Sequence, residues 1–261
     1  MQDFLKQIIR EGGFIAKGYY QDGIEYQTKG DPTDFVTKAD KEVSNFLIKK
    51  ITEKYPEHGI ISEEEAEMIN PNAEYVWIMD PIDGTRNFAK HIGVWCTMIA
   101  VLKNNKPYMA AIYDALNDEL FFAEVGKGSF LNDKQIKVSS QEDLKSFFVV
   151  FSCGQNRPNS PYNIGEEKLK KYLRFYNNLT GKDGHWVSNY STALSIAHLA
   201  AGRIDAVIFC GGLIWDLMPG FIIATEAGAN FTDSEGQIWR GDCKDMIAAN
   251  PNLHEKLLEF F

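Results

Sequence analysis

The sequence lacks the patterns that mark several common classes of protein. Its four cysteines, Cys96, Cys153, Cys210 and Cys243, form no CxxC pair and no ladder with histidines, so neither a zinc site nor a redox motif is indicated. No apolar run is long enough to span a bilayer, and the charged, amphipathic N-terminus is unlike a signal peptide. Scattered reduced cysteines are typical of a cytoplasmic protein, and that is the location we expect.

Common catalytic signatures are missing as well. No GxSxG elbow occurs, and GKGSF at 126–130 lacks the spacing of a phosphate-binding loop, so we interpret it as a β-turn. Cys153 could be a nucleophile, but a small buried residue beside a strand is the better interpretation. The histidines are dispersed along the chain, at His58, His91, His185, His198 and His254.

The chain has fewer basic than acidic side chains. The 261 residues include 27 basic and 36 acidic side chains, which gives a formal net charge of −9. Such a chain is a poor candidate for binding nucleic acid or an anionic membrane, and we expect neither partner. It would also repel an anionic substrate unless cations intervened, although acidity alone is equally consistent with simple solubility.

The order of the expected elements indicates an α/β protein with two layered halves. Helical spacing predicts helices over residues 3–20 and 38–55, and a meander of strands follows at 59–62, 75–80, 96–102, 106–114 and 118–125. Later segments alternate: strands at 147–151 and 203–209, and helices at 166–178, 191–201, 219–227 and after Asn250-Pro251. We place an N-terminal α+β half at 1–140 and a C-terminal α/β half at 141–261, sharing one catalytic unit.

The stretch WIMDPIDGTRNF at 77–88 is the most informative. Asp80 ends an apolar strand, Pro81 cannot continue the hydrogen-bond ladder, and Gly84 permits a tight turn after Asp83. Two carboxylates and the carbonyl between them would then point to one place, which suits a hard cation such as Mg²⁺. A plain strand-to-helix turn, capped by Asp83, is the alternative.

Two other acidic positions favour the metal site over that alternative. Glu63-Glu64-Glu65 follows the apolar run GIIS, and Asp216 follows a strand and two glycines at the start of a helix. Taken alone, each position has a simpler interpretation: the three glutamates as a solvated loop, and Asp216 as the N-cap of a helix. Acids that gather at strand ends without a cation would raise one another's pKa values, and two divalent ions roughly 3.5–4 Å apart would remove that cost and clamp a phosphate.

Four blocks of the chain, spread over residues 29–229, resemble the inositol monophosphatase family of the lithium-sensitive, Mg²⁺-dependent phosphatase superfamily. DFVTKAD (34–40) is similar to the family's DxVTxxD, and ISEEE (61–65) to its GEE. WIMDPIDGTRNF (77–88) is almost a complete copy of WxxDPIDGTxNF, and WDLMPGFIIATEAGA (215–229) is similar to WDxAAGxxIxxEAGG. The resemblance implies an αβαβα layered sandwich, the sugar phosphatase fold.

The resemblance also implies a role for each matching residue. Two or three Mg²⁺ ions would be held by Glu64, Asp80, the Ile82 carbonyl, Asp83 and Asp216, with Glu65 as the alternative to Glu64. Thr85 and Asp40 would orient the attacking water, with Glu64 counted among the catalytic residues. Lys29 would lie near a metal-bound water. Substrate would be bound by Asp83, Gly84, Thr85, Ser191, Thr192 and Asp216, the amides of Gly84 and Thr85 holding phosphate oxygens.

The function implied is that of a phosphoric monoester hydrolase acting by in-line attack of a metal-activated water. The substrate would be a small phosphorylated metabolite, inositol monophosphate or a related sugar phosphate, and a homodimer is expected from relatives. Ser62 replaces the Gly of GEE, and Phe209 stands near where inositol-selective members carry an acid. These departures leave alternatives: histidinol phosphate, fructose 1,6-bisphosphate, 3′-phosphoadenosine nucleotides, or a regulatory role through a protein partner.

Overall fold

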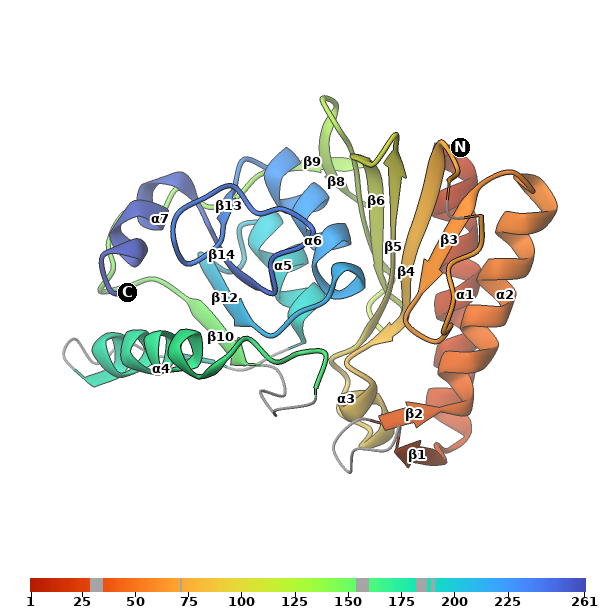
Figure 1. Cartoon of the computed structure of the whole chain (residues 1–261), viewed down its shortest axis with the longest axis horizontal. Helices are drawn as coiled ribbons and strands as arrows, with labels where there is room; N and C mark the ends of the chain where they lie inside the picture. Colours follow the sequence, from red (N-terminus) through yellow and green to blue (C-terminus); the bar gives the residue numbers. More distant parts are fainter. Residues whose placement is uncertain (29–34, 71, 154–159, 182–186, 189–190) are drawn as a thin grey trace.

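A computed structural model describes residues 1–28, 35–70, 72–153, 160–181, 187–188 and 191–261. Five layers alternate between helices and sheets, in the order αβαβα, as Figure 1 shows. The N-terminus begins in one outer helical layer, and the C-terminus lies at the other (Figure 1). The layered α/β class expected from the sequence is confirmed.

The larger sheet has seven strands in chain order and is antiparallel except where β3 pairs parallel with β4. The predicted meander of short apolar segments is extended by two strands after a turn at 125–127, and residues 128–130, expected in that turn, instead begin the first of these strands. The strands are β3 (Gly59–Ser62), β4 (Tyr75–Asp83), β5 (Cys96–Lys103), β6 (Lys106–Asp114), β7 (Glu119–Glu124), β8 (Gly128–Leu131) and β9 (Lys134–Ile136).

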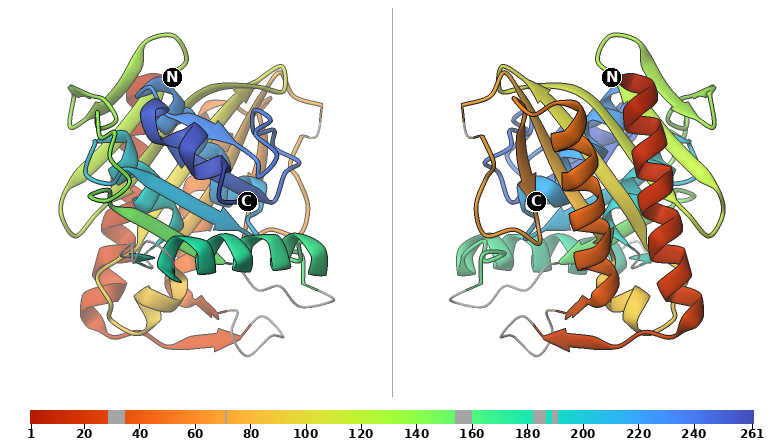
Figure 2. Two further views of the ribbon diagram at one scale, coloured as in Figure 1. Left: turned by 90° about the vertical axis from the view of Figure 1, so that its left-hand side faces the viewer. Right: turned by 90° about the vertical axis from the view of Figure 1, so that its right-hand side faces the viewer.

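Helices α1 (Gln2–Asp22) and α2 (Lys38–Lys54) lie side by side on the outer face of this sheet (Figure 2). The buried stripe of α1 includes Leu5, Ile8 and Ile9, whereas the apolar Phe14 is 55% exposed. The sheet instead meets Gly13, where an added Cβ would stand 2.5 Å from a ring carbon of Tyr113. Glycine thus allows α1 to approach the sheet closely and turns Phe14 outward.

The smaller sheet has five strands in the order β11-β10-β12-β14-β13. They are β10 (Val149–Cys153), β11 (Val187–Ser188), β12 (Ala206–Cys210), β13 (Asn230–Thr232) and β14 (Asp245–Ala249). Between the two sheets lie α5 (Thr192–Ala200) and α6 (Ile214–Glu226), and one apolar cluster joins both sheets to these helices. Residues from both predicted halves therefore share a core, while the boundary near residue 140 stays a prediction.

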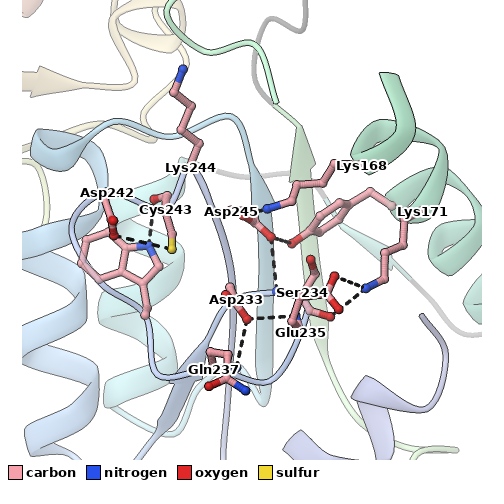
Figure 3. Close-up of polar contacts among 12 residues, drawn as sticks. Lys168, Lys171, Asp233, Ser234, Glu235, Gln237, Asp242, Cys243, Lys244 and Asp245 are labelled. Atoms are coloured by element: carbon pink, nitrogen blue, oxygen red, sulfur yellow. Dashed lines mark hydrogen bonds and ion pairs between the residues drawn. The ribbon is translucent and has the colours of Figure 1, made fainter. Parts of the chain in front are cut away.

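The outer face of the smaller sheet is covered by α4 (Glu166–Gly181) and α7 (Pro251–Leu258), seen from that side in Figure 2. The buried carboxylate of Asp245, on β14, hydrogen-bonds two residues of α4. Its Oδ1 accepts from Lys168 Nζ at 2.6 Å, and its Oδ2 accepts from Tyr172 Oη at 2.9 Å. Figure 3 shows Lys168 reaching Asp245 from the helix, beside the Asp233–Glu235 turn.

The remaining elements lie at one end of the molecule. A hairpin pairs β1 (Tyr26–Thr28) with β2 (Phe35–Thr37), and the short α3 (Thr85–Ala89) follows β4 beside it (Figure 1). Within the described residues, no helix combines the length and apolarity needed to cross a membrane.

Candidate active site

The predicted site residues gather where strands and helices of several layers end. Asp80 and Asp83 close β4, Glu63 follows β3, Ser191 caps α5, and Asp216 lies in the first turn of α6. Segments more than 150 residues apart in the chain thus supply acidic groups to one region, as the sequence predicts for acids at strand ends.

A bulge in β4 determines how its two aspartates point. Asp80 pairs with Met98 and Asp83 with Cys96, so three residue steps on β4 face two on β5. In a regular strand, side chains three positions apart would lie on opposite faces; the extra residue turns Asp83 back toward the side of Asp80. Pro81, which has no N–H to donate, falls within this irregularity.

Three carboxylates converge closely enough to hold one cation. Oxygen atoms of Glu63, Asp80 and Asp216 all lie within 4.8 Å of one another. Asp80 is buried, and the other two are half-buried. Such a set of hard oxygen donors is the kind that Mg²⁺ and similar divalent ions prefer, so the donor chemistry fits the predicted metal.

The glutamate in this cluster differs from the predicted one. Sequence comparison gave the position to Glu64, with Glu65 as the alternative, whereas the structure places Glu63 there. The reason is the parallel pairing of Ser62 with Met79: the Glu63 N–H continues it by donating to the Met79 carbonyl at 3.2 Å, which brings Glu63 beside Asp80.

Glu64 lies at a different place in the same loop. A pocket of about 370 Å³ extends from the loop to the β1–β2 hairpin and is lined by Gln27, Thr28, Val36, Lys41, Glu63, Glu64, Glu65 and Ala66. The charge of Glu64 also reaches Asp40, whose pKa it helps to raise. Glu64 is therefore close to Asp40 but outside the three-carboxylate cluster.

Asp40 and Thr85 meet as predicted for a water-orienting pair. The Thr85 hydroxyl lies 3.3 Å from Asp40 Oδ1 and 2.9 Å from the Ile82 carbonyl oxygen, and can donate to either. Asp40 is held at the first turn of α2 by a capping box, in which its Oδ2 accepts from the Thr37 N–H at 2.7 Å. The same box orients Oδ1 toward Thr85.

Gly84 is required by the turn after Asp83. Its φ of 85° lies in the left-handed region, and an added Cβ would stand 2.9 Å from the Val94 carbonyl oxygen. A side chain at this position would thus shift the turn that follows both aspartates and begins α3.

Asp83 and Ser191 join the site to the middle helical layer. Ser191 Oγ donates to Asp83 Oδ2, and the Ala193 N–H reaches the same oxygen at 3.2 Å. Ser191 also caps α5 by accepting from the Leu194 N–H, as predicted. Thr192, half-buried, begins the helix next to it.

Burial raises the pKa values of three of these carboxyl groups, so they ionise less readily than exposed ones. Desolvation raises the pKa of Asp40 to about 7 and that of Asp83 to about 6, even though hydrogen bonds from Thr37 and Ser191 oppose the rise. Burial also raises the pKa of Asp80 well above its usual value, and repulsion from Glu63, Asp83 and Asp216 adds to it. A cation placed among them would reverse these shifts.

Two expectations lie outside the described residues. One of them is Lys29, predicted near a metal-bound water, which falls in 29–34; the other is the segment 189–190 directly before Ser191. Phe209 is described: it is buried in the apolar cluster between the sheets, on the strand that leads to Asp216. Glu63, which motif matching did not select, is the glutamate that the structure brings into the three-carboxylate cluster, and its role as a metal ligand stays a proposal.

Five alternating layers with acidic groups at the sheet ends are the architecture of a metal-dependent class of phosphatases. The chain belongs to the inositol monophosphatase family, whose model matches residues 1–261.

Known relatives agree with this assignment over nearly the whole chain. The Nus factor SuhB of Escherichia coli strain K12 is 32% identical over 257 residues, covering 95% of this chain and 90% of the relative. An inositol monophosphatase of Dictyostelium discoideum is 32% identical and covers 98% and 91%. The crystal structure of suhB from Bartonella henselae superposes with a TM-score of 0.88 at 29% identity, covering 99% and 97%. The protein is a phosphatase of small phosphorylated substrates, in a metal-dependent family.

Proposed function

We propose that this chain hydrolyses a small phosphate monoester with the help of two or three Mg²⁺ ions. The ligands would be Glu63, Asp80, Asp83, Asp216 and the carbonyl oxygen of Ile82. When bound, the ions would neutralise charge on the phosphate and supply Lewis-acid assistance to an in-line displacement. The convergence of Glu63, Asp80 and Asp216 within 4.8 Å is the observation that carries this proposal.

Thr85 and Asp40 would control the attacking water. If the Thr85 hydrogen points to Asp40 Oδ1, the Thr85 oxygen is left to accept a hydrogen from water, and Asp40 can take up the proton. In that orientation the Ile82 carbonyl no longer accepts from Thr85 and is available to a cation. The capping box holds Asp40 beside Thr85, so the proton can pass from the Thr85 hydroxyl to Asp40 Oδ1.

The substrate would be inositol monophosphate or a related sugar or metabolite phosphate. Gly84, Thr85, Ser191 and Thr192 would contact it, the first two through their amides. Phe209 is apolar where an inositol-selective site would have an acid, which favours another metabolite, such as histidinol phosphate, fructose 1,6-bisphosphate or a 3′-phosphoadenosine nucleotide. Inhibition by lithium, a homodimer and a cytoplasmic location are also part of the proposal.

Asp83→Asn tests the site directly. We expect at least about a hundredfold loss of Mg²⁺-dependent phosphate release with the fold intact, because the amide removes a charge from the cation site. Release is measured over a panel of metabolite phosphates with the wild type, and then on the best substrate for the variant. Asp22→Asn, at the exposed end of α1, is the matched control. Wild-type turnover in Asp83→Asn would show that the site is misassigned.

A regulatory role is the second candidate function. It is supported by the 32% identity with a protein named Nus factor SuhB. Recovery of transcription proteins in a pull-down, together with no phosphate release on the whole panel, would favour that role over the enzyme.

A further inference from the structure

Two cysteines that are distant in sequence face each other at one end of the smaller sheet. Cys153 is the last residue of β10 and Cys210 the last residue of β12, and they are direct partners in this parallel pair. Their sulfur atoms lie 2.8 Å apart. Adjacent strands are spaced about 4.8 Å apart, within the range of Cα separations that a disulfide spans. A disulfide between these sulfurs can therefore form without a change in the spacing of the two strands.

The two thiols differ in access to solvent. Cys153 is exposed, contrary to the buried position expected from the sequence, and Cys210 is fully buried under α4. The Cys210 S–H donates to Cys153, and this hydrogen bond lowers the pKa of the Cys153 thiol. The accessible sulfur is thus the better nucleophile, and the buried sulfur lies directly behind it.

The other cysteines lack this arrangement. Cys96 is buried in the larger sheet, and Cys243 lies near Asp242, its sulfur 3.8 Å from a carboxylate oxygen. Since all four cysteines are within the described residues, Cys153 and Cys210 are the one pair whose sulfurs are in contact.

We propose that Cys153 and Cys210 form a reversible disulfide by exchange with a small disulfide such as oxidised glutathione. The Cys153 thiolate attacks the small disulfide, forms a mixed disulfide and releases one thiolate. Cys210 then loses its proton and attacks the Cys153 sulfur, which releases the second thiolate. Two electrons and two protons pass from the cysteine pair to the reagent, which leaves as two thiols.

The disulfide would affect the chain that carries Asp216. From Cys210 the backbone runs through Gly211 and Gly212, whose N–H groups both donate to the Lys244 carbonyl, at 2.7 and 2.8 Å, and then enters α6. Closing the bond draws the sulfurs from 2.8 Å to about 2.05 Å and ties this segment to β10. Small displacements of catalytic groups are costly, so we expect turnover to fall several-fold on oxidation. This regulatory step rests on the proposed function.

Peptide mapping tests the bond itself. The wild type, Cys153→Ser and Cys243→Ser are equilibrated with oxidised glutathione, the remaining thiols are alkylated under denaturing conditions, and the digests are analysed by mass spectrometry. We expect a Cys153–Cys210 linked peptide in the wild type and in Cys243→Ser, its loss in Cys153→Ser, and its reversal by dithiothreitol. If Cys153 carries only bound glutathione, or stays reduced while Cys243 reacts, the disulfide proposal is overturned.

Phosphate release from the same samples tests the regulation. Oxidised wild type should be slowed several-fold and recover with dithiothreitol, whereas Cys153→Ser should be insensitive. Unchanged turnover in fully cross-linked protein overturns the regulatory step. Absence of phosphate release by the reduced wild type would instead count against the proposed function, and the peptide map would still decide whether the bond forms.

Discussion

Glu63 and Glu64 are neighbours in the chain, yet the backbone gives them different surroundings. The N–H of Glu63 continues the β3–β4 pairing, and its carboxylate joins Asp80 and Asp216. Glu64 lies in the same turn, lines the adjacent pocket, and its charge raises the pKa of Asp40. A position in the turn, and not the residue type, thus separates a proposed metal ligand from a neighbouring acid.

Replacing each glutamate by glutamine should separate the two roles. Glu63→Gln removes a charge from the three-carboxylate cluster, and we expect about a hundredfold lower phosphate release and a higher Mg²⁺ requirement. Glu64→Gln should cost less than about tenfold, since Glu64 lies outside the three-carboxylate cluster and its charge acts on Asp40 through space. Both are measured as kcat against Mg²⁺ concentration, with Glu65→Gln as control. A larger loss of phosphate release in Glu64→Gln than in Glu63→Gln would show that Glu64 is the metal ligand.

Most of the predicted site residues lie close together in the structure because they sit in short, rigid motifs. Asp80, Asp83 and Gly84 are fixed by one bulge and one left-handed turn, and both leave a direct mark in the sequence as DPIDG. Glu63 was missed because three identical residues follow β3, and only the register of Ser62 against Met79 shows which one faces Asp80. Register depends on pairing between strands, which a run of identical side chains cannot reveal.

Helix α6 shows how an element boundary can escape sequence patterns. Pro219 predicted a start near residue 219, because proline favours the first turn of a helix. The helix begins at Ile214, where the Asp216 carboxylate accepts from the Leu213 N–H at 2.6 Å and the Leu213 carbonyl accepts from Asp216 and Leu217. One side chain thus caps the helix and, in the proposed site, holds a cation.

Helix α4 depends on the buried carboxylate of Asp245. Burial alone would raise the pKa of Asp245, but the Lys168 ammonium and the hydroxyl of Tyr172 lower it below its usual value. A pKa depressed in the folded state adds stability above the unfolded value of about 3.8, and this stability is lost as pH falls through the folded pKa. The contact therefore contributes near neutral pH and disappears in acid.

Lys168→Met should destabilise the protein at neutral pH by about 1–3 kcal/mol. The variant leaves Asp245 buried without its cation, and the loss is moderated because Lys168 is partly in water. Thermal unfolding measured from pH 3 to 7 should show the two proteins converging in acid. Lys170→Met is the matched control on the same helix, since its partners Glu166 and Glu167 are exposed, and it should change stability by less than about 0.5 kcal/mol. Equal losses in the two variants would contradict a special role for Asp245.

At the scale of the whole molecule, the sequence predicted the layered α/β class and the long elements better than the short strands. The long meander of β4 to β7 and the amphipathic α2 carry strong periodicity, and both were found close to the predicted bounds. The strands β1, β2, β9, β11 and β13 have two or three residues each, too few for an alternating pattern. The strands β9, β11 and β13 each pair with a longer neighbour, and β1 and β2 pair with each other. Such pairing is information that local sequence does not contain.

The carboxylates also link the stability of the whole molecule to pH and to Mg²⁺. Asp40, Asp80 and Asp83 have raised pKa values in the folded state, about 7 for Asp40 and about 6 for Asp83. A raised pKa adds stability that is complete below the unfolded value of about 3.8 and is lost as pH rises through the folded value. The metal-free protein should therefore lose stability from this source as pH rises from about 4 to about 7, the interval between the unfolded and folded pKa values of Asp40 and Asp83.

Mg²⁺ should oppose that loss, because it binds the ionised carboxylates of the folded state and not the unfolded chain. We expect the increase in Tm caused by 10 mM Mg²⁺, roughly a saturating concentration for such sites, to grow from pH 5 to pH 8. Asp80→Asn should have a higher metal-free Tm than the wild type at pH 8, since it removes a buried charge, and should respond little to Mg²⁺. Calorimetric scans of both proteins with and without Mg²⁺ make the comparison. A wild type whose Mg²⁺ response is the same at pH 5 and pH 8, or matches that of Asp80→Asn, would mean that these carboxylates do not share a cation.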